Sequence, residues 1–421
     1  MDLINLTATQ AARLIRDGGL NPIDLTEAFL DHIARRDPSV KAFAFFDADL
    51  VRNSAASCRP GPLHGIPIGV KDVLDTADMP SEYGSPIWRG WRPKADAAAV
   101  AAAREAGAVL FGKTVTTEFA TRQPGPAMNP VNPAHTPGGS SSGSAAGVGA
   151  GLFPLAFGTQ TAGSVIRPAA FCGVVGYKPS FGLICRGGMK IMSDSLDTVG
   201  VMARTVADCA LFAGAVSGRD LGDPDAKTHL LPRIGVCRTP AWSAAAPETV
   251  ALLERVSDAL GRAGASVCRR ELPDGFAELI EAHPIVMNAE SARSLAWELA
   301  HRSGQISAGL RERLAFGIGQ SEAALNNAYA VFERTRAAFP QAMDGLDVLV
   351  TPAAPGEAPN GLEWTGDPAF NFIWTSLHVP CVTVPAGTGP NGLPLGIQVI
   401  GQRGDDRAVL ARARWVESAL G

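Results

Sequence analysis

Helical and strand-like segments alternate along most of the chain. An alanine-rich run at 95–106 ends at Gly107, as helices commonly do, and the apolar residues 108–112 indicate the strand that this helix leads into. The same order returns at 248–263 and 265–267. Such alternation is typical of α/β proteins, so we predict a mixed, largely parallel central sheet that is covered by helices.

Both ends of the chain add elements to this pattern. Thr7 and Gln10 form a capping box, and Pro22 stands at the first position of a periodic helix that extends to Arg36. A last helix is predicted at about 404–420. Short apolar runs predict further buried strands at 234–237, 347–350, 381–385 and 395–400.

The length of the chain fits one large domain. Single α/β domains reach 421 residues, and a domain of this size buries about three quarters of its unfolded surface. No repeat or low-complexity linker divides the sequence, so we expect a single domain over 1–421. The segment from about 270 to 345 is mostly helical and has no recognisable motif, which predicts a cap or a peripheral lobe beside the site.

Composition and charge narrow the range of partners. The chain is 46% hydrophobic and 19% charged, and its formal net charge at pH 7 is −4. Because the lysines and arginines are scattered, no nucleic-acid partner and no membrane are indicated, and a small-molecule substrate is expected instead. These features leave the oligomeric state open, with a homo-oligomer as one alternative.

Neither metal nor cofactor is predicted. The seven cysteines contain no Cys-x-x-Cys spacing and therefore indicate neither a disulfide framework nor a zinc site. No phosphate-binding Gly-Lys-Ser/Thr follows the glycine-rich segments. The N-terminus has no basic leader, and charge, glycine or proline interrupts every window of about eighteen residues, so we expect a cytoplasmic protein.

The clearest chemical signal is a pair of serine-bearing glycine loops that follow a lysine in an apolar run. Lys71 ends Gly-Ile-Pro-Ile-Gly-Val-Lys, Ser140 lies in Gly-Gly-Ser-Ser-Ser-Gly-Ser, and Ser164 ends Gly-Thr-Gln-Thr-Ala-Gly-Ser. A serine hydroxyl becomes a nucleophile when a base takes its proton, and a lysine is that base only where its surroundings disfavour the ammonium form. The trio therefore indicates acyl transfer without histidine.

The second loop also fits an oxyanion hole, because small residues from Thr161 to Ser164 can present consecutive backbone N–H groups to a carbonyl oxygen. A rival interpretation makes Ser141 the nucleophile, since Gly139-Ser-Ser141-Ser-Gly143 matches the elbow of α/β-hydrolases. That elbow needs a buried strand directly before it, and Asn-Pro-Ala-His-Thr-Pro-Gly stands there instead.

These segments resemble the amidase signature family. The matching residues are His-Gly-Ile-Pro-Ile-Gly-Val-Lys71-Asp, Pro-Gly-Gly-Ser140-Ser, and Gly-Thr-Gln-Thr-Ala-Gly-Ser164, which runs on to Arg-Pro-Ala-Ala-Phe-Cys-Gly. The similarity is dense from about 61 to 210 and returns in Gly-Leu-Pro-Leu-Gly-Ile-Gln at 392–398. The resemblance implies one amidase-signature domain.

It also implies a Ser-cisSer-Lys triad, with Ser164 as the acylated nucleophile, Ser140 as the proton bridge and Lys71 as the general base. The N–H groups of Thr161, Ala162, Gly163 and Ser164 would form the oxyanion hole. The Ser164 hydroxyl would attack the amide carbonyl, ammonia or an amine would leave, and water would free the acid. The implied enzyme is a cofactor-independent amidase that hydrolyses the C–N bond of a linear amide.

Three positions depart from the commoner family pattern. Ser142 and Ala162 replace glycines, and Arg167 follows the nucleophile by three residues rather than two. If position 162 requires a positive φ, alanine is strained there by roughly 1 kcal/mol and displaces an oxyanion donor. Arg167 is a candidate bidentate ligand for a substrate carboxylate, which would favour carboxylate-bearing amides, and the competing interpretation is a structural contact under the loop.

Two other functions stay open. The family also contains subunits of glutamine-dependent amidotransferases, which need partner proteins. The second alternative is a catalytically inactive binding protein, in which Ala162 has disabled the oxyanion hole. Turnover by the isolated chain distinguishes the first alternative from a hydrolase, and covalent labelling of Ser164 by a fluorophosphonate excludes the second.

Overall fold

The computed structural model describes residues 2–223 and 231–421, and a single mixed sheet runs through it. Its strands lie in the order β1, β3, β2, β4, β6, β5, β10, β11, β9, β7 and β8. Their bounds are Phe43–Phe46, Pro67–Lys71, Val109–Thr114, Leu155–Gln160, Val175–Lys178, Thr198–Ala203, Arg233–Cys237, Ser266–Arg270, Val348–Pro352, Cys381–Thr388 and Pro394–Ile400 for β1 to β11. The predicted α/β class with a mixed sheet is confirmed.

The parallel part of the sheet is smaller than the sequence suggested. Among the described strands, parallel pairing joins β2 to β3 and β4, and β7 to β8 and β9, whereas the six remaining pairs are antiparallel. Parallel strands need a long crossover, which α4 and α8 supply. The connection between β10 and β11 is a short turn at 389–393, and so short a turn permits only antiparallel pairing.

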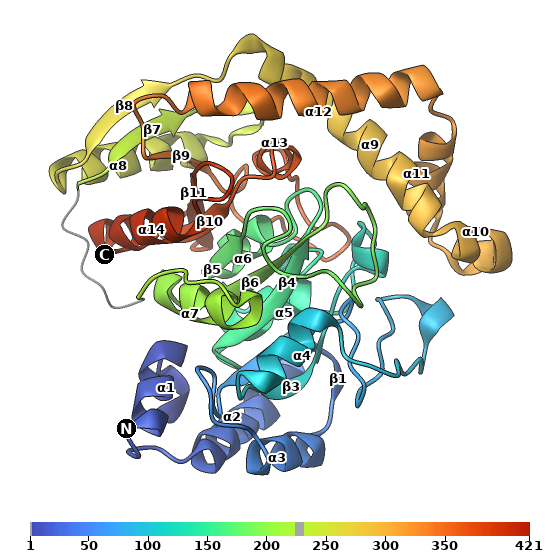
Figure 1. Ribbon diagram of the computed structural model, residues 1–421, viewed down its shortest axis with the longest axis vertical. Helices are drawn as coiled ribbons and strands as arrows, with labels where there is room; N and C mark the ends of the chain where they lie inside the picture. The colour runs from blue at the N-terminus through green and yellow to red at the C-terminus, as the bar shows by residue number, and fades with distance from the viewer. Residues whose placement is uncertain (1, 224–230) are drawn as a thin grey trace.

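Helices cover the sheet and continue into a helical layer (Figure 1). The helices α1 to α14 span Ala8–Arg16, Pro22–Arg36, Ala48–Ala56, Ala98–Glu105, Ser142–Gly149, Ile166–Cys172, Val206–Ser217, Pro247–Arg262, Leu279–Ser294, Ala296–Arg302, Ala308–Ile318, Glu322–Ala342, Phe372–Ser376 and Asp406–Leu420. The capping box predicted for α1 is present, and α2 begins at Pro22 and ends at Arg36 as predicted. None of the described helices is long and apolar enough to cross a membrane.

Two large groups of buried side chains make up most of the core. The first packs helices such as α2, α5 and α7 against β2, β3 and β4, with Phe111, Phe153 and Phe157 buried there, and continues beneath α8 and α14 to β7, β9, β10 and β11. The second lies beneath α9, α12 and α13 and includes Phe339 and Trp374. In Figure 1, α12 extends along one end of the molecule, with α9 and α11 beside each other next to it.

Candidate active site

Lys71 is the last residue of β2, and its side chain is fully buried. Its Nζ lies 2.8 Å from Ser140 Oγ, 2.7 Å from Thr159 Oγ1 and 3.3 Å from the Thr159 carbonyl oxygen. Burial lowers the pKa of Lys71 to about 7, against the opposing influence of the Asp197 carboxylate. Near neutral pH the amine therefore exists in both protonation states, as a general base requires.

Thr159, on β4, was not singled out from the sequence. The parallel pairing of β2 with β4 brings this threonine to the end of Lys71. A threonine in a buried strand is common, so the residue type alone carries no signal. Only the pairing of the two strands reveals the contact.

A second buried lysine neutralises the carboxylate that follows Lys71 in the sequence. Lys113 Nζ, from β3, lies 2.8 Å from Asp72 Oδ1 and also donates to Ser81 Oγ and the Pro80 carbonyl. An unpaired carboxylate beside Lys71 would favour its ammonium form. Because Asp72 is paired with Lys113, its charge is compensated.

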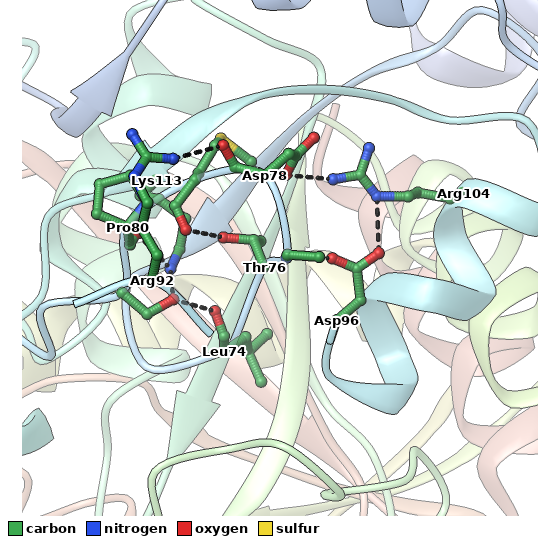
Figure 2. A network of polar contacts seen from close by, with 11 residues as sticks. Leu74, Thr76, Asp78, Pro80, Arg92, Asp96, Arg104 and Lys113 are labelled. Carbon is green, nitrogen blue, oxygen red and sulfur yellow. Dashed lines mark hydrogen bonds and ion pairs between the residues drawn. The ribbon is translucent and has the colours of Figure 1, made fainter. Parts of the chain in front are cut away.

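The segment after β2 is tied down by a polar network, which Figure 2 shows. Arg104, on α4, donates to Asp78 at 2.6 Å and to Asp96 at 2.9 Å. Arg92 donates to the Asp78 carbonyl at 2.9 Å. These contacts fasten the long loop between β2 and α4 to the helix that precedes β3, and so they hold the surroundings of Asp72 and Lys113 in place.

Ser140 follows a cis peptide bond with Gly139 and lies just before α5. Its side chain is buried and contacts Lys71 as described above. The neighbouring Ser141, which the elbow pattern favoured, is engaged with the backbone of β4 instead. Its hydroxyl accepts from the Thr159 N–H at 3.2 Å and donates to the Thr159 carbonyl at 3.3 Å.

Ser164 stands just before α6, is 8% exposed and lines a pocket. Among the described residues its hydroxyl has no hydrogen-bond partner. Arg167, one turn further along, donates to the carbonyl of Gly139 at 2.7 Å, and this contact joins the two serine loops. The structure thus joins Lys71 to Ser140 by a hydrogen bond, while the Ser164 hydroxyl lies at the pocket wall without a partner in the described part of the chain.

The predicted oxyanion loop leaves its amides unoccupied. Within the described part of the chain, none of the N–H groups of residues 161–164 donates a hydrogen bond to the protein. Ala162 is not among the residues with positive φ, so the strain anticipated for alanine at this position is absent. The Thr161 hydroxyl donates to Asp197, whose carboxylate also accepts from the N–H groups of Met192 and Ser193.

Arg167 lies beneath the serine loops rather than free in the pocket. Its Nε donates to the Thr365 carbonyl at 2.8 Å, and its Nη2 donates to Gly139. Only the buried Nη1 lacks a partner among the described residues. The guanidinium therefore has one nitrogen left for a ligand, which departs from the bidentate geometry that the sequence suggested.

The pocket beside Ser164 has a volume of about 210 Å³ and contains three arginines. Its lining comprises Ala120, Thr121, Arg122, Thr161, Ala162, Ser164, Arg167, Met192, Ile280, His283, Pro284, Met287, Arg313, Thr365, Gly366, Asp367, Pro368 and Phe372. Asp367 is the one carboxylate in this set, so the lining carries an excess of positive charge. A larger cavity of about 330 Å³ lies among β7, β8 and α8 and includes none of the predicted site residues.

Arg313, on α11, was not predicted from the sequence. Its Nε donates to the amide oxygen of Asn288 at 3.2 Å and its Nη2 contacts the Met287 sulfur, so both neighbours are neutral. Burial lowers the pKa of Arg313 to about 10, and the positive charge of Arg122 acts in the same direction. At neutral pH the guanidinium still carries its charge, without an ion pair to any described carboxylate.

A family model described as Amidase matches residues 24–410. The chain belongs to the amidase signature family. The family resemblance found in the three sequence segments is therefore confirmed, and it extends across the helical segment 270–345 as well.

This amidase-family chain is similar both to amidotransferase subunits and to solved amidases. The A-type subunit of the glutamyl-tRNA(Gln) amidotransferase from Roseiflexus castenholzii is 32% identical over 97% of this chain and 94% of the relative. That alignment runs over 464 positions although the chain has 421 residues, so the relative contains segments that this chain lacks. Among solved structures, an amidase is 29% identical with a TM-score of 0.89 and covers 99% of this chain and 100% of its own. The peptide amidase of Stenotrophomonas maltophilia is 30% identical with a TM-score of 0.82 over 99% and 97%.

Proposed function

We propose that the chain releases ammonia from a small carboxylate-bearing amide through an acyl-enzyme on Ser164. The observation that carries this proposal is the hydrogen bond between the buried Lys71 amine and Ser140, beside a loop with unoccupied N–H groups. A base, a nucleophile and an oxyanion hole are the parts that acyl transfer needs.

In the proposed mechanism neutral Lys71 donates its two N–H groups to Thr159 and directs its lone pair at the Ser140 hydroxyl. Ser140 passes its proton to Lys71 and takes the proton of Ser164, whose oxygen forms a bond to the amide carbon. The amide N–H groups of residues 161–164 hold the resulting oxyanion. The proton returns to the leaving nitrogen, ammonia departs, and water cleaves the Ser164 ester by the same relay. The link between the two serines closes when substrate binds, as catalytic hydrogen bonds commonly do.

The charge of the pocket supports the carboxylate preference. Arg122 and Arg313 face the same cavity as Ser164, and Arg167 offers its single free nitrogen from beneath. Guanidinium groups are well suited to carboxylates, and such contacts are strong where water is excluded. A neutral amide would leave Asp367 as the one carboxylate among the three arginines of the pocket lining.

We expect the isolated chain to hydrolyse succinamate faster than butyramide, which has the same length without the carboxylate. In Arg313→Met, kcat/KM for succinamate should fall about 10- to 100-fold, because a charge-assisted hydrogen bond contributes about 1.5–3 kcal/mol. The value for butyramide should stay within about threefold. Ammonia release from both substrates by both proteins is the measurement. Equal losses on the two substrates would contradict the carboxylate preference.

The named relatives favour a second context for the same chemistry. Glutamine is itself a carboxylate-bearing amide, and an amidotransferase subunit would release ammonia from it for an acceptor held by partner proteins. The names of the curated relatives support this interpretation, while the matched length of the solved amidase supports a free-standing hydrolase. Ammonia release from glutamine by the isolated chain favours the hydrolase. Turnover that requires both an acceptor and added partner proteins favours the amidotransferase.

The pH profile should follow Lys71. With its pKa lowered to about 7, the fraction of neutral amine rises with pH and saturates above that value. We therefore expect kcat/KM for a neutral amide to rise about tenfold per pH unit below pH 7 and to level off above it. Measurement between pH 5.5 and 9 with butyramide isolates the enzyme's own titration, because this substrate does not ionise in that range. A profile that falls with rising pH would contradict the assignment of the base.

A further inference from the structure

Two side chains from outside the serine loops bind carbonyl oxygens of the oxyanion loop. His283, on α9, contacts the carbonyl oxygen of Thr161 through Nε2 at 3.0 Å. Thr375, on α13, donates from Oγ1 to the carbonyl of Ala162 at 2.8 Å. These are consecutive peptide units of the loop that the proposed function uses as its oxyanion hole.

Holding these carbonyls also fixes the direction of the next N–H groups. In a trans peptide unit the C=O and the following N–H lie in one plane and point in opposite directions. A hydrogen bond to the Thr161 carbonyl therefore aims the N–H of Ala162 away from His283. A bond to the Ala162 carbonyl likewise sets the N–H of Gly163.

His283 has the chemical form that this role needs. Its ring is buried, and burial lowers its pKa to about 4, so the imidazole is neutral at physiological pH. A carbonyl oxygen only accepts, which means that Nε2 carries the single proton and donates it to Thr161. The ring also packs against Phe372, with centroids 5.4 Å apart.

Thr375 is directed toward the loop by Gln160. The Gln160 Oε1 accepts from the N–H groups of Val165 and Ile166 at 2.9 and 3.0 Å, which fixes the orientation of its amide. The amide nitrogen of Gln160 then donates to Thr375 Oγ1 at 2.9 Å. Because that oxygen accepts from Gln160, its own hydrogen is available to a carbonyl, and the Ala162 carbonyl at 2.8 Å is a nearer acceptor than the Asn371 carbonyl at 3.4 Å.

We propose that His283 and Thr375 are positioning residues that aim the N–H groups of Ala162 and Gly163 at the developing oxyanion. This inference rests on the proposed function of the same loop. It gives the helical segment 270–345 a part in catalysis, because α9 belongs to that segment and supplies one of the two contacts. Ground-state binding depends on the pocket wall, whereas loop alignment matters most in the transition state, so the predicted signature is a loss of kcat.

The test compares His283→Leu with His283→Gln, since glutamine keeps a neutral N–H donor of similar reach. We expect His283→Leu to lower kcat about 10- to 100-fold with KM within about threefold, which is less than the 10²- to 10³-fold typical of losing an oxyanion donor outright. His283→Gln should recover most of that loss. Ser291→Ala is the control, because Ser291 is buried on the same helix and its hydroxyl, among the residues that the structure describes, bonds only to the Met287 carbonyl.

Several results would overturn the inference. Unchanged kcat in His283→Leu, equal loss in the leucine and glutamine variants, or a rise in KM alone would each reduce His283 to a packing residue. If His283→Leu does not fold, Thr375→Val against Thr375→Ser applies the same criterion to the neighbouring peptide unit. If the Ser164→Ala variant turned over substrate at the wild-type rate, the proposed function itself would be overturned. The failure of the proposed function and the failure of this inference are therefore distinguishable.

Discussion

Replacing Ser164 with alanine is expected to lower ammonia release on the order of 10⁴-fold or more. The substitution removes the atom that carries the acyl group, and residues of a nucleophile–base unit typically cost this much when removed singly. Because Ser164 lies at the pocket wall without a partner among the described residues, its loss should leave the fold intact. Steady-state ammonia release and the thermal unfolding temperature of both proteins are the measurements.

Ser141→Ala is the matched control for this experiment. Ser141 lies beside Ser140 and satisfies the hydrolase elbow, but its hydroxyl is engaged with the backbone of Thr159. Its loss should cost far less activity than that of Ser164. A fluorophosphonate should label Ser164 in the wild type. An unlabelled protein with no turnover would support an inactive binding protein, and a label on Ser141 would reverse the assignment of the nucleophile.

Lys71→Met should abolish most activity and yet make the protein more stable. Removing a general base typically costs 10²- to 10⁴-fold in rate. The folded state holds the pKa of Lys71 at about 7, below the ordinary value of 10.5, so the unfolded chain binds more protons between these values. The free energy of unfolding therefore decreases by on the order of 4 kcal/mol as pH falls from 10.5 to 7. Methionine removes that penalty but leaves Ser140 and Thr159 short of a partner, at about 1 kcal/mol each.

We thus expect a net gain of about 2 kcal/mol in the free energy of unfolding at pH 7, and the effect should turn into a loss near pH 10, where the protonation penalty has almost vanished and the two lost hydrogen bonds remain. Urea denaturation at both pH values measures it. Lys113→Met provides a control of opposite sign, because removing one partner of the buried pair with Asp72 destabilises a protein by about 3–5 kcal/mol. Equal destabilisation by both substitutions would mean that Lys71 is charged in the folded state.

Local signals made much of the fold predictable. The capping box at Thr7 and the proline at position 22 fixed the starts of α1 and α2, because caps are set by residues within one turn. The apolar runs that predicted β7, β9, β10 and β11 are strands. Strand direction was less accessible, since it depends on which strands pair across the sheet and not on the periodicity of any one of them.

Local sequence signals likewise predicted some residues of the site and missed others. Lys71 and Ser140 were found through contiguous motifs, and the structure brings them into contact. Thr159 could not be predicted from the sequence, because it contacts Lys71 only through strand pairing. Arg313 and His283 could not be predicted either, because they lie on helices that contain no motif. Strain at Ala162 depended on a positive φ at this position, and the backbone there does not have one. Arg167 lies beside the pocket as expected, but its Nε and Nη2 donate to Thr365 and Gly139.

In the proposed enzyme, the wall formed by α9 would limit how substrate choice can change. Ile280, Pro284 and Met287 border the same hollow as His283. Substitution of Ile280, Pro284 or Met287 would change the space available to an acyl group. His283, in contrast, must remain a hydrogen-bond donor to the oxyanion loop. Evolution or engineering can therefore change substrate specificity at the three other pocket positions of α9 only if position 283 retains the imidazole or an equivalent donor.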